Sequence, residues 1–291
     1  MLIANPIYDV VFKYLFEDNK IAKILISAII GEEIIELDFQ PQEHTTTIDS
    51  SLNVRGKHSF TVYRLDFKAK IKQSDGSYKL VIIEIQKAKM TIDILRFRKY
   101  LGEQYSNPEN IYEINGKKKP LPIVNIYFLG DGLGSQNNSP VIKSNREIID
   151  LVTGEKIGFK SDFIDALSHD TYIVSIPNLV QKRRNELEMI LSVFDQKNIT
   201  TDKHILNVKE EDFPERYRNI IRRLQKAQET KQIRKTMDVE DEILSELALI
   251  EREIGKLEHI VIEKDKTIEQ KDKEIEAQKR IIEELQRKIK E

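Results

Sequence analysis

The stretch Lys79-Leu80-Val81-Ile82-Ile83-Glu84-Ile85-Gln86-Lys87 has the composition of a buried β-strand. Five of its nine residues are aliphatic and four of those are β-branched, which favours the extended conformation. Glu84 and Gln86 interrupt the apolar run near its end, and they share one face because strand side chains alternate. A buried carboxylate is costly unless it is paired, hydrogen-bonded or bound to a cation. Glu84 is therefore either a satisfied core carboxylate, for example in a salt bridge, or a functional acid.

A second strand-like run, residues 59–71, precedes this stretch, and residues 73–78 connect the two. Asp75-Gly76 in the connection is a strong hairpin signal. The hairpin brings a second buried-type acid, Asp66, across from Glu84. Two adjacent carboxylates repel each other, whereas hard cations such as Mg²⁺ prefer oxygen ligands. The hairpin therefore predicts a divalent-cation site.

The register of the hairpin decides whether the two acids can meet. With a two-residue turn at Asp75-Gly76, facing residue numbers would sum to 151, and Asp66 and Glu84 would point to opposite faces. A shared metal requires an even sum, such as 150 or 152. A three-residue loop or a bulge with Gly76 in the left-handed conformation provides one, and we predict that arrangement.

Four stretches of the chain together form a recognisable pattern. They are Tyr8-Asp9-Val10-Val11-Phe12-Lys13, Ile83-Glu84-Ile85-Gln86, Arg96-Phe97-Arg98-Lys99-Tyr100 and Pro120-Leu121-Pro122-Ile123-Val124-Asn125-Ile126-Tyr127. With Asp66 on the hairpin, this pattern resembles the PD-(D/E)XK nuclease superfamily, and within it the transposase-like, recombination-promoting nucleases. The resemblance covers roughly residues 5 to 195. It implies a restriction-endonuclease-like α/β core, with a central mixed sheet flanked by helices, that hydrolyses DNA with Mg²⁺.

The resemblance also implies the metal ligands. Asp66 and Glu84 would bind Mg²⁺, with the Ile85 carbonyl as a third protein ligand. Gln86 stands where the superfamily pattern has lysine, and an amide cannot act as an acid, a base or a positive charge. Gln86 would instead orient the attacking water or a phosphate oxygen by hydrogen bonding.

Two helices would contribute the remaining site residues. By resemblance, Asp9 is an outer carboxylate with Lys13 one turn later on the same face. The alternative for Asp9 is a first-turn acid stabilised by the helix dipole. Arg96 and Tyr100 would face the scissile phosphate, with Arg96 stabilising its charge. The alternative for these two is a solvated helix face.

The positive charge that Gln86 lacks has two candidate replacements. One is Lys13, and the other is Lys68, which shares the strand face of Asp66. Position along a strand is the only support that the sequence offers for Lys68.

The composition excludes several classes of protein. The formal net charge of −2 gives no overall attraction to nucleic acid, and the absence of cysteine excludes disulfides and thiolate zinc sites. The five histidines are scattered without ligand spacing. The N-terminus does not resemble a signal peptide, and no apolar run reaches about 20 residues. We therefore expect a soluble, cytoplasmic protein.

Other elements follow from local patterns. Asn5-Pro6 is a plausible helix entry, with Asn5 as the cap, and Gly31 can end an apolar helix over residues 21–30. Residues 91–105 and 186–194 read as helices, and residues 121–129 and 171–176 as strands. The loop from Gly130 to Gly134 reads as flexible.

The last third of the chain is helical and charged. Residues 215–235 are locally basic and are either a solvated helix face or a contact to phosphate backbone. A heptad repeat then predicts a coiled coil and self-association, since isolated helices are marginal in water. Its first seam is Leu247, Ile254, Val261, Ile268, Ile275, Ile282 and Ile289, and its second is Ile243, Ile250, Leu257, Lys264, Lys271, Gln278 and Leu285.

We expect a nuclease-like domain over residues 1–210, a basic helical linker over 211–239 and a coiled coil over 240–291. The leading function is a Mg²⁺-dependent DNA endonuclease that forms homo-oligomers, most simply dimers. Two rival functions are a nuclease fold that binds DNA without cutting it and an interaction scaffold built on the coiled coil.

Overall fold

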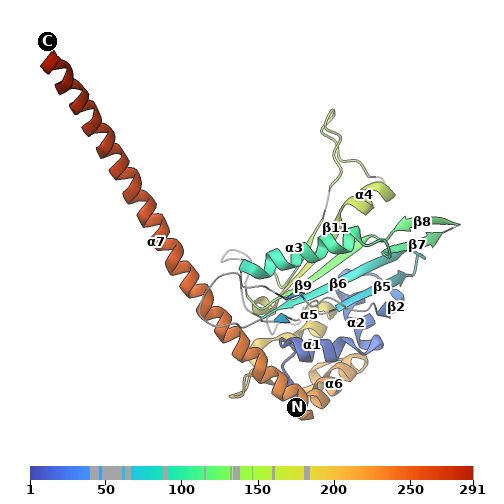
Figure 1. Cartoon of the computed structure of the whole chain (residues 1–291). Coiled ribbons are helices and arrows are strands. Elements are labelled where there is room, and N and C mark those ends of the chain that lie inside the picture. Colours follow the sequence, from blue (N-terminus) through green and yellow to red (C-terminus); the bar gives the residue numbers. More distant parts are fainter. Residues whose placement is uncertain are drawn as a thin grey trace. The chain divides into compact units, whose positions relative to one another are not determined.

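The computed structural model describes residues 1–39, 46–47, 61–62, 67–87, 91–114, 116–131, 133, 138–145, 147–158, 161–179 and 184–290. Asp66 and the side chain of Arg96 lie outside these described residues. The chain divides into two compact units, Met1–Met237 and Asp238–Glu291. The first unit is an α/β core (Figure 1), and the second consists of most of one long helix.

A six-stranded mixed sheet lies at the centre of the first unit, in the order β10-β11-β9-β6-β5-β2. β6 pairs with β9 in parallel and with β5 in antiparallel orientation, so the stretch that contains Glu84 is a central strand. This sheet confirms the prediction of a mixed α/β core. Its strands are β2 (Ile34–Phe39), β5 (Phe67–Gln73), β6 (Tyr78–Gln86), β9 (Ile123–Leu129), β10 (Val141–Ser144) and β11 (His169–Ser175).

Helices α1 (Asp9–Phe16) and α2 (Asn19–Ile30) cover one face of this sheet (Figure 1). They pack on the odd-numbered residues of β6 and the even-numbered residues of β9. The rings of Phe12 and Phe128, for example, lie 5.2 Å apart. Gly31, at φ +73°, ends α2 in the left-handed conformation, as the sequence predicts.

Helix α3 (Thr91–Ser106) covers the opposite face (Figure 1). Phe97, Tyr100 and Leu101 pack there on Leu80 and Ile82, which alternate with the residues under α1. The alternative interpretation of a solvated helix face is therefore wrong for Tyr100, which is buried against the sheet. We call the two sides of the sheet the α1 face and the α3 face.

The predicted helix entry at Asn5 is wrong, because α1 begins at Asp9 with Tyr8 as its cap residue. The Asn5 side chain accepts a hydrogen bond from the Ile7 amide at 3.2 Å and donates to Gln196 at 2.9 Å. Asn5 is thus held by a contact 191 residues away in sequence, and no local pattern could reveal it.

Residues 211–237, predicted as part of a linker, belong to the first unit. Helix α6 (Arg218–Glu229) is amphipathic and buries Ile220, Ile221 and Leu224 in the core under α1. α5 (Glu186–Leu191) is buried in the same cluster. The segment is therefore a structural part of the core.

Short elements complete the first unit. They are the strand pairs β1 (Leu2–Ala4) with β12 (Ile205–Asn207), β3 (Thr46–Thr47) with β4 (Thr61–Val62) and β7 (Ile111–Ile114) with β8 (Lys117–Pro120), helix α4 (Asp162–Leu167), and 3-10 turns at Ile176–Asn178, Ser192–Phe194, Gln196–Asn198, Glu210–Asp212 and Glu215–Tyr217. Helix α7 (Lys231–Lys290) begins in the first unit and provides the second.

Candidate active site

Glu84 is a buried carboxylate on the central strand of the sheet, with 6 % of its surface exposed. It lies on the α3 face, between Ile82 and Gln86, and pairs with Tyr127 of β9. Desolvation of a carboxylate at such a position is unfavourable and adds nothing to apolar packing. The burial of Glu84 therefore marks it as a candidate functional acid.

The register of the β5–β6 hairpin is the even one that the sequence predicts. Facing residue numbers sum to 150, from Phe67 opposite Ile83 to Lys72 opposite Tyr78. The connection is a three-residue loop, in which the Gly76 amide donates to the Gln73 carbonyl at 3.0 Å with φ at +81°. This register is the one that a shared metal requires. The predicted approach of the Asp66 carboxylate to Glu84 stays a prediction, because position 66 is not described.

Gln86 ends β6 at a crowded junction with the end of β9. Its carbonyl accepts a hydrogen bond of 2.6 Å from the Gly130 amide. A Cβ atom on Gly130 would clash with the carbonyl oxygens of Gln86 and Lys87. Gly130 is therefore required by close backbone contact, which the sequence interpretation of a flexible loop missed. Its position directly after a buried strand was the available signal.

Polar side chains from β5 and α3 meet on the α3 face of the sheet, the face that also carries Glu84. Lys68, opposite Ile82, donates to the Gln104 side chain at 3.3 Å. Gln104, one turn after Tyr100, is itself buried. Burial lowers the pKa of the Lys68 ammonium, and the nearby charge of Glu109 opposes that shift. The α3 face thus holds a partly desolvated cation on the strand next to Glu84.

Asp9 and Lys13 lie on the helix that covers the other face. The Lys13 ammonium forms an ion pair with the Asp9 carboxylate at 2.8 Å, as expected for residues one turn apart. The ammonium of Lys87, the residue directly after β6, lies 3.4 Å from the centre of the Tyr8 ring. The structure therefore brings the start of α1 to the end of β6 but engages Lys13 with Asp9.

Two other predicted site residues, Ile85 and Tyr100, lie on opposite faces of the sheet. The Ile85 side chain is buried on the α1 face and pairs with Phe128. An aliphatic side chain has no metal-ligand atom, so any contribution of Ile85 to a metal site is restricted to its backbone carbonyl. Tyr100 faces the sheet from α3. The described residues contain no group of three or more histidine or acidic side chains that could hold a metal. The proposed site differs from such a group because it combines two carboxylates, of Asp66 and Glu84, with a backbone carbonyl.

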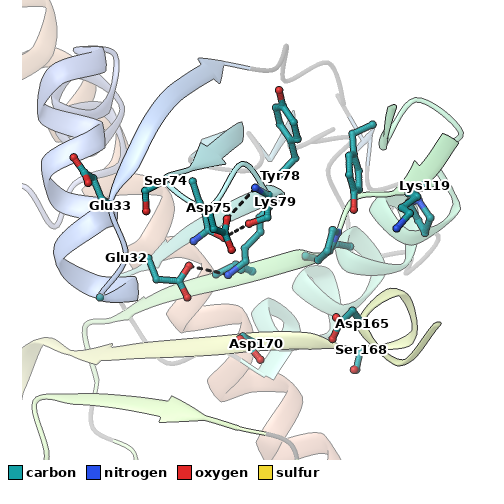
Figure 2. Close-up of a pocket in the computed structure, with 18 residues that line it drawn as sticks. Glu32, Glu33, Ser74, Asp75, Tyr78, Lys79, Lys119, Asp165, Ser168 and Asp170 are labelled. Atoms are coloured by element: carbon teal, nitrogen blue, oxygen red, sulfur yellow. Dashed lines mark hydrogen bonds and ion pairs between the residues drawn. The ribbon is translucent and has the colours of Figure 1, made fainter. Parts of the chain in front are cut away.

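A cavity of about 680 Å³ lies at the turn end of the hairpin (Figure 2). Acids dominate its charged lining, including Glu33, Asp165 and Asp170, and the Glu32 carboxylate is paired with Lys79 at 2.9 Å. Tyr78 at this end is six residues before Glu84, about 20 Å at ~3.3 Å per residue. The cavity and the buried acid are therefore separate features.

The basic stretch of α6 and early α7 is paired with acids of the core. Arg222 contacts Glu210 at 2.9 Å, and Arg234 contacts Asp202 at 2.6 Å. Arg216 pairs with Glu186. These ion pairs engage arginines that a contact to phosphate backbone would use, so they favour a structural role of the stretch over such a contact.

Two buried polar groups on the α3 face escaped the sequence interpretation. Neither polar atom of the fully buried Asn125 side chain has a hydrogen-bond partner among the described residues, and the same holds for the Ser175 hydroxyl. Asn125 pairs with Ile82 of β6, two residues before Glu84. Its place in an apolar strand was the signal, but strand composition alone does not reveal which polar atoms lack partners.

Comparison with family models, curated proteins and solved structures found no match. Among the described residues, no helix has the length and hydropathy that a membrane span requires.

Proposed function

We propose that this chain is a Mg²⁺-dependent DNA endonuclease of the PD-(D/E)XK, transposase-like type, with a restriction-endonuclease-like core. The observation that carries the proposal is the buried Glu84 carboxylate on a central strand whose hairpin has the even register. In this register, position 66, the next residue before Phe67, is the one that would oppose Glu84 if the pairing continues.

The described residues fit a divalent-cation site in part. Glu84 supplies one carboxylate, the Ile85 carbonyl an oxygen, and Asp66 would complete the pair. A bound Mg²⁺ would polarise the phosphate and lower the pKa of an attacking water. Gln86 would orient that water or a phosphate oxygen by hydrogen bonding.

Lys68 is the better of the two candidates for the missing positive charge. It shares the α3 face with Glu84, whereas Lys13 is engaged by Asp9 on α1. Partial burial strengthens the interaction of the Lys68 ammonium with a phosphate because water screens it less. Arg96 and Tyr100 would approach the phosphate from α3, on the same side.

Plasmid nicking by the full-length chain, with and without Mg²⁺, tests the proposal. We expect nicking that requires Mg²⁺ and falls by at least roughly a hundredfold in Glu84→Ala, the scale of losing one charge-stabilising group. Glu36→Ala is the matched control, because Glu36 is exposed and pairs with Lys72 on the neighbouring strand. It should leave nicking unchanged.

Stability separates a catalytic from a structural role of Glu84. Removal of one of two adjacent carboxylates relieves repulsion, so the thermal stability of Glu84→Ala without Mg²⁺ should hold or rise slightly. A large loss of stability with unchanged nicking would identify Glu84 as a structural ion-pair residue.

A second candidate function is DNA binding without cleavage, and the amide at Gln86 favours it. In that case the full-length chain shifts DNA in a gel but does not nick a plasmid at any Mg²⁺ concentration. A chain that neither binds nor nicks DNA leaves the interaction scaffold as the remaining function.

A further inference from the structure

The long helix α7 exposes its apolar heptad positions along its length. Every described side chain from residue 252 to residue 283 is exposed, and the aliphatic seam residues range from 42 % exposed at Ile254 to 61 % at Leu257. A helix with such a stripe is marginal alone in water and is stabilised when a second helix covers the stripe. The partner helix that covers the stripe, and its direction relative to α7, follow from the charges along the helix.

We infer that a second copy of α7 covers this stripe in antiparallel orientation. The first argument is the distribution of charge. Residues 240–258 contain seven acidic and two basic residues, whereas residues 279–290 contain five basic and two acidic ones. A parallel pair places the acidic ends together, and an antiparallel pair places each acidic end against a basic end.

The second argument is the pair of lysines that interrupts the second seam. In a parallel, in-register pair, Lys264 and Lys271 each face their own counterpart, and like charges directly opposed are unfavourable. Glu253 would also approach Glu258 of the second copy, because flanking positions five residues apart meet across a parallel seam. The parallel arrangement therefore accumulates like charges in both its core and its flanks.

The third argument is that one antiparallel register matches the first seam of each copy with the second seam of the other along the whole stripe. When facing numbers sum to 532, every second-seam residue meets a first-seam residue, so each lysine faces an aliphatic side chain. The lysine stem can pack on that side chain while the ammonium reaches solvent. The facing pairs are Leu247 with Leu285, Ile250 with Ile282, Ile254 with Gln278, Leu257 with Ile275, Val261 with Lys271 and Lys264 with Ile268.

The consequence is a long separation between the two copies of any residue near the start of the stripe. From residue 247 to residue 285 the paired segment measures about 57 Å at ~1.5 Å per residue. In the parallel arrangement the two copies of Leu247 would instead lie in contact. Cross-linking between the two copies of one residue can therefore distinguish the parallel from the antiparallel arrangement.

Disulfide trapping in the full-length chain distinguishes the two directions. The chain has no cysteine, so Leu247→Cys and Leu285→Cys each introduce a single thiol. We expect an equal mixture of the two variants, one of them carrying a size tag, to form mainly the mixed disulfide on oxidation. Each variant alone should form little disulfide.

Same-position disulfides within one variant would overturn the inference in favour of a parallel pair. A monomer at micromolar concentration in sedimentation, or a trimer, would overturn it as well. A mixed disulfide from a sedimenting dimer supports it.

Charge reversal provides a second test that does not depend on cysteine. In Glu246→Lys with Glu253→Lys, the antiparallel dimer loses charge complementarity, and its dissociation constant should rise by about tenfold. The same variant would relieve repulsion in a parallel dimer and lower the dissociation constant, which would contradict the inference. Glu263→Lys with Glu269→Lys, at outward heptad positions, is the matched control and should change it little.

Discussion

The two faces of the central sheet bury different kinds of residue. Toward α1 and α2, β6 and β9 present Ile83, Ile126 and Phe128, which are fully buried apolar side chains. Toward α3, the same strands present Glu84 and Asn125 among their apolar residues. Both faces belong to the same strands, so the difference cannot arise from strand propensity.

This difference indicates which face carries the chemistry. Apolar burial contributes roughly 25 cal/mol per Å² to folding, while buried polar groups without partners oppose it. The α1 face therefore accounts for much of the stability of the core. The α3 face retains groups that stability does not explain, and one of them, Asn125, lies on the strand next to the proposed catalytic acid.

The largest effect on stability should come from the α1 face. Phe128→Ala removes a ring that lies 4.9 Å from Phe194, and should lower the free energy of unfolding by about 3–5 kcal/mol. Leu129→Ala, one residue along and on the α3 side, is partly buried and should lower it less. All ten tyrosines precede residue 218, so tyrosine fluorescence during urea denaturation reports the first unit.

A substitution at a polar residue of the α3 face should raise the free energy of unfolding, whereas Phe128→Ala lowers it. Asn125→Leu replaces a fully buried amide that has no hydrogen-bond partner among the described residues. The free energy of unfolding should rise by about 1–3 kcal/mol, the cost of burying an unsatisfied polar group. Ser175→Ala is the control for the same effect with a smaller group. A loss of stability in both variants would show that these groups have structural partners and would remove the contrast between the faces.

Local patterns predicted the parts of the fold that depend on nearby residues. The run from Lys79 to Lys87 coincides within one residue with β6, and the helix expected at 91–105 is α3. The expected loop with an odd number of residues is present, with Gly76 in the left-handed conformation. Each depends on residues within a few positions of one another. Side-chain periodicity and turn chemistry are sufficient there.

Contacts between distant segments could not be predicted. The parallel pairing of β6 with β9 makes Gly130 obligatory, and the arginines of α6 pair with acids such as Glu210. Composition suggested a flexible loop from Gly130 onward and a basic linker over residues 211–239. The partners that decide the outcome are brought together only by folding, so a single sequence does not contain a local signal for them.

Glu188 is a second buried acid, and it lies on the α1 side of the sheet. The Glu188 carboxylate accepts hydrogen bonds from the Arg184 side chain and from the Arg184 amide at 2.9 Å, while Asn185 caps the Glu188 amide. The hydrogen bond from the Arg184 side chain lowers the pKa of Glu188. The ion pair with Arg184 therefore stabilises the buried charge of Glu188.

Glu188→Gln should lower the free energy of unfolding at pH 7 by about 1 kcal/mol. A carboxyl whose pKa is lowered on folding stabilises the protein above its unfolded pKa, and this contribution is lost as the pH falls through the folded pKa. The difference from the wild type should therefore shrink below about pH 4.5, the ordinary value for glutamate. Urea titrations at pH 7, 5 and 4 measure it. A difference that does not depend on pH would mean that packing, and not charge, accounts for the effect.

The smallest effect on stability is expected at Lys68. Burial lowers the pKa of Lys68, so the charged form is less favourable in the folded chain than in the unfolded one. At neutral pH this charge opposes folding, and the penalty fades as the pH rises through the folded pKa toward the unfolded value. Lys68→Met should therefore raise the free energy of unfolding at pH 7 slightly, by at most about 0.5 kcal/mol because the group is partly solvated.

The gain in Lys68→Met should shrink as the pH is raised toward 10, and urea titrations from pH 7 to pH 10 measure it. Lys70→Met, two residues along the same strand face, controls for the loss of a lysine as such. In nicking assays, Lys68→Met should reduce Mg²⁺-dependent cleavage and Lys70→Met should not. If both variants cut DNA as the wild type does, Lys68 does not supply the charge that Gln86 lacks, and its burial on the α3 face serves only the contact with Gln104.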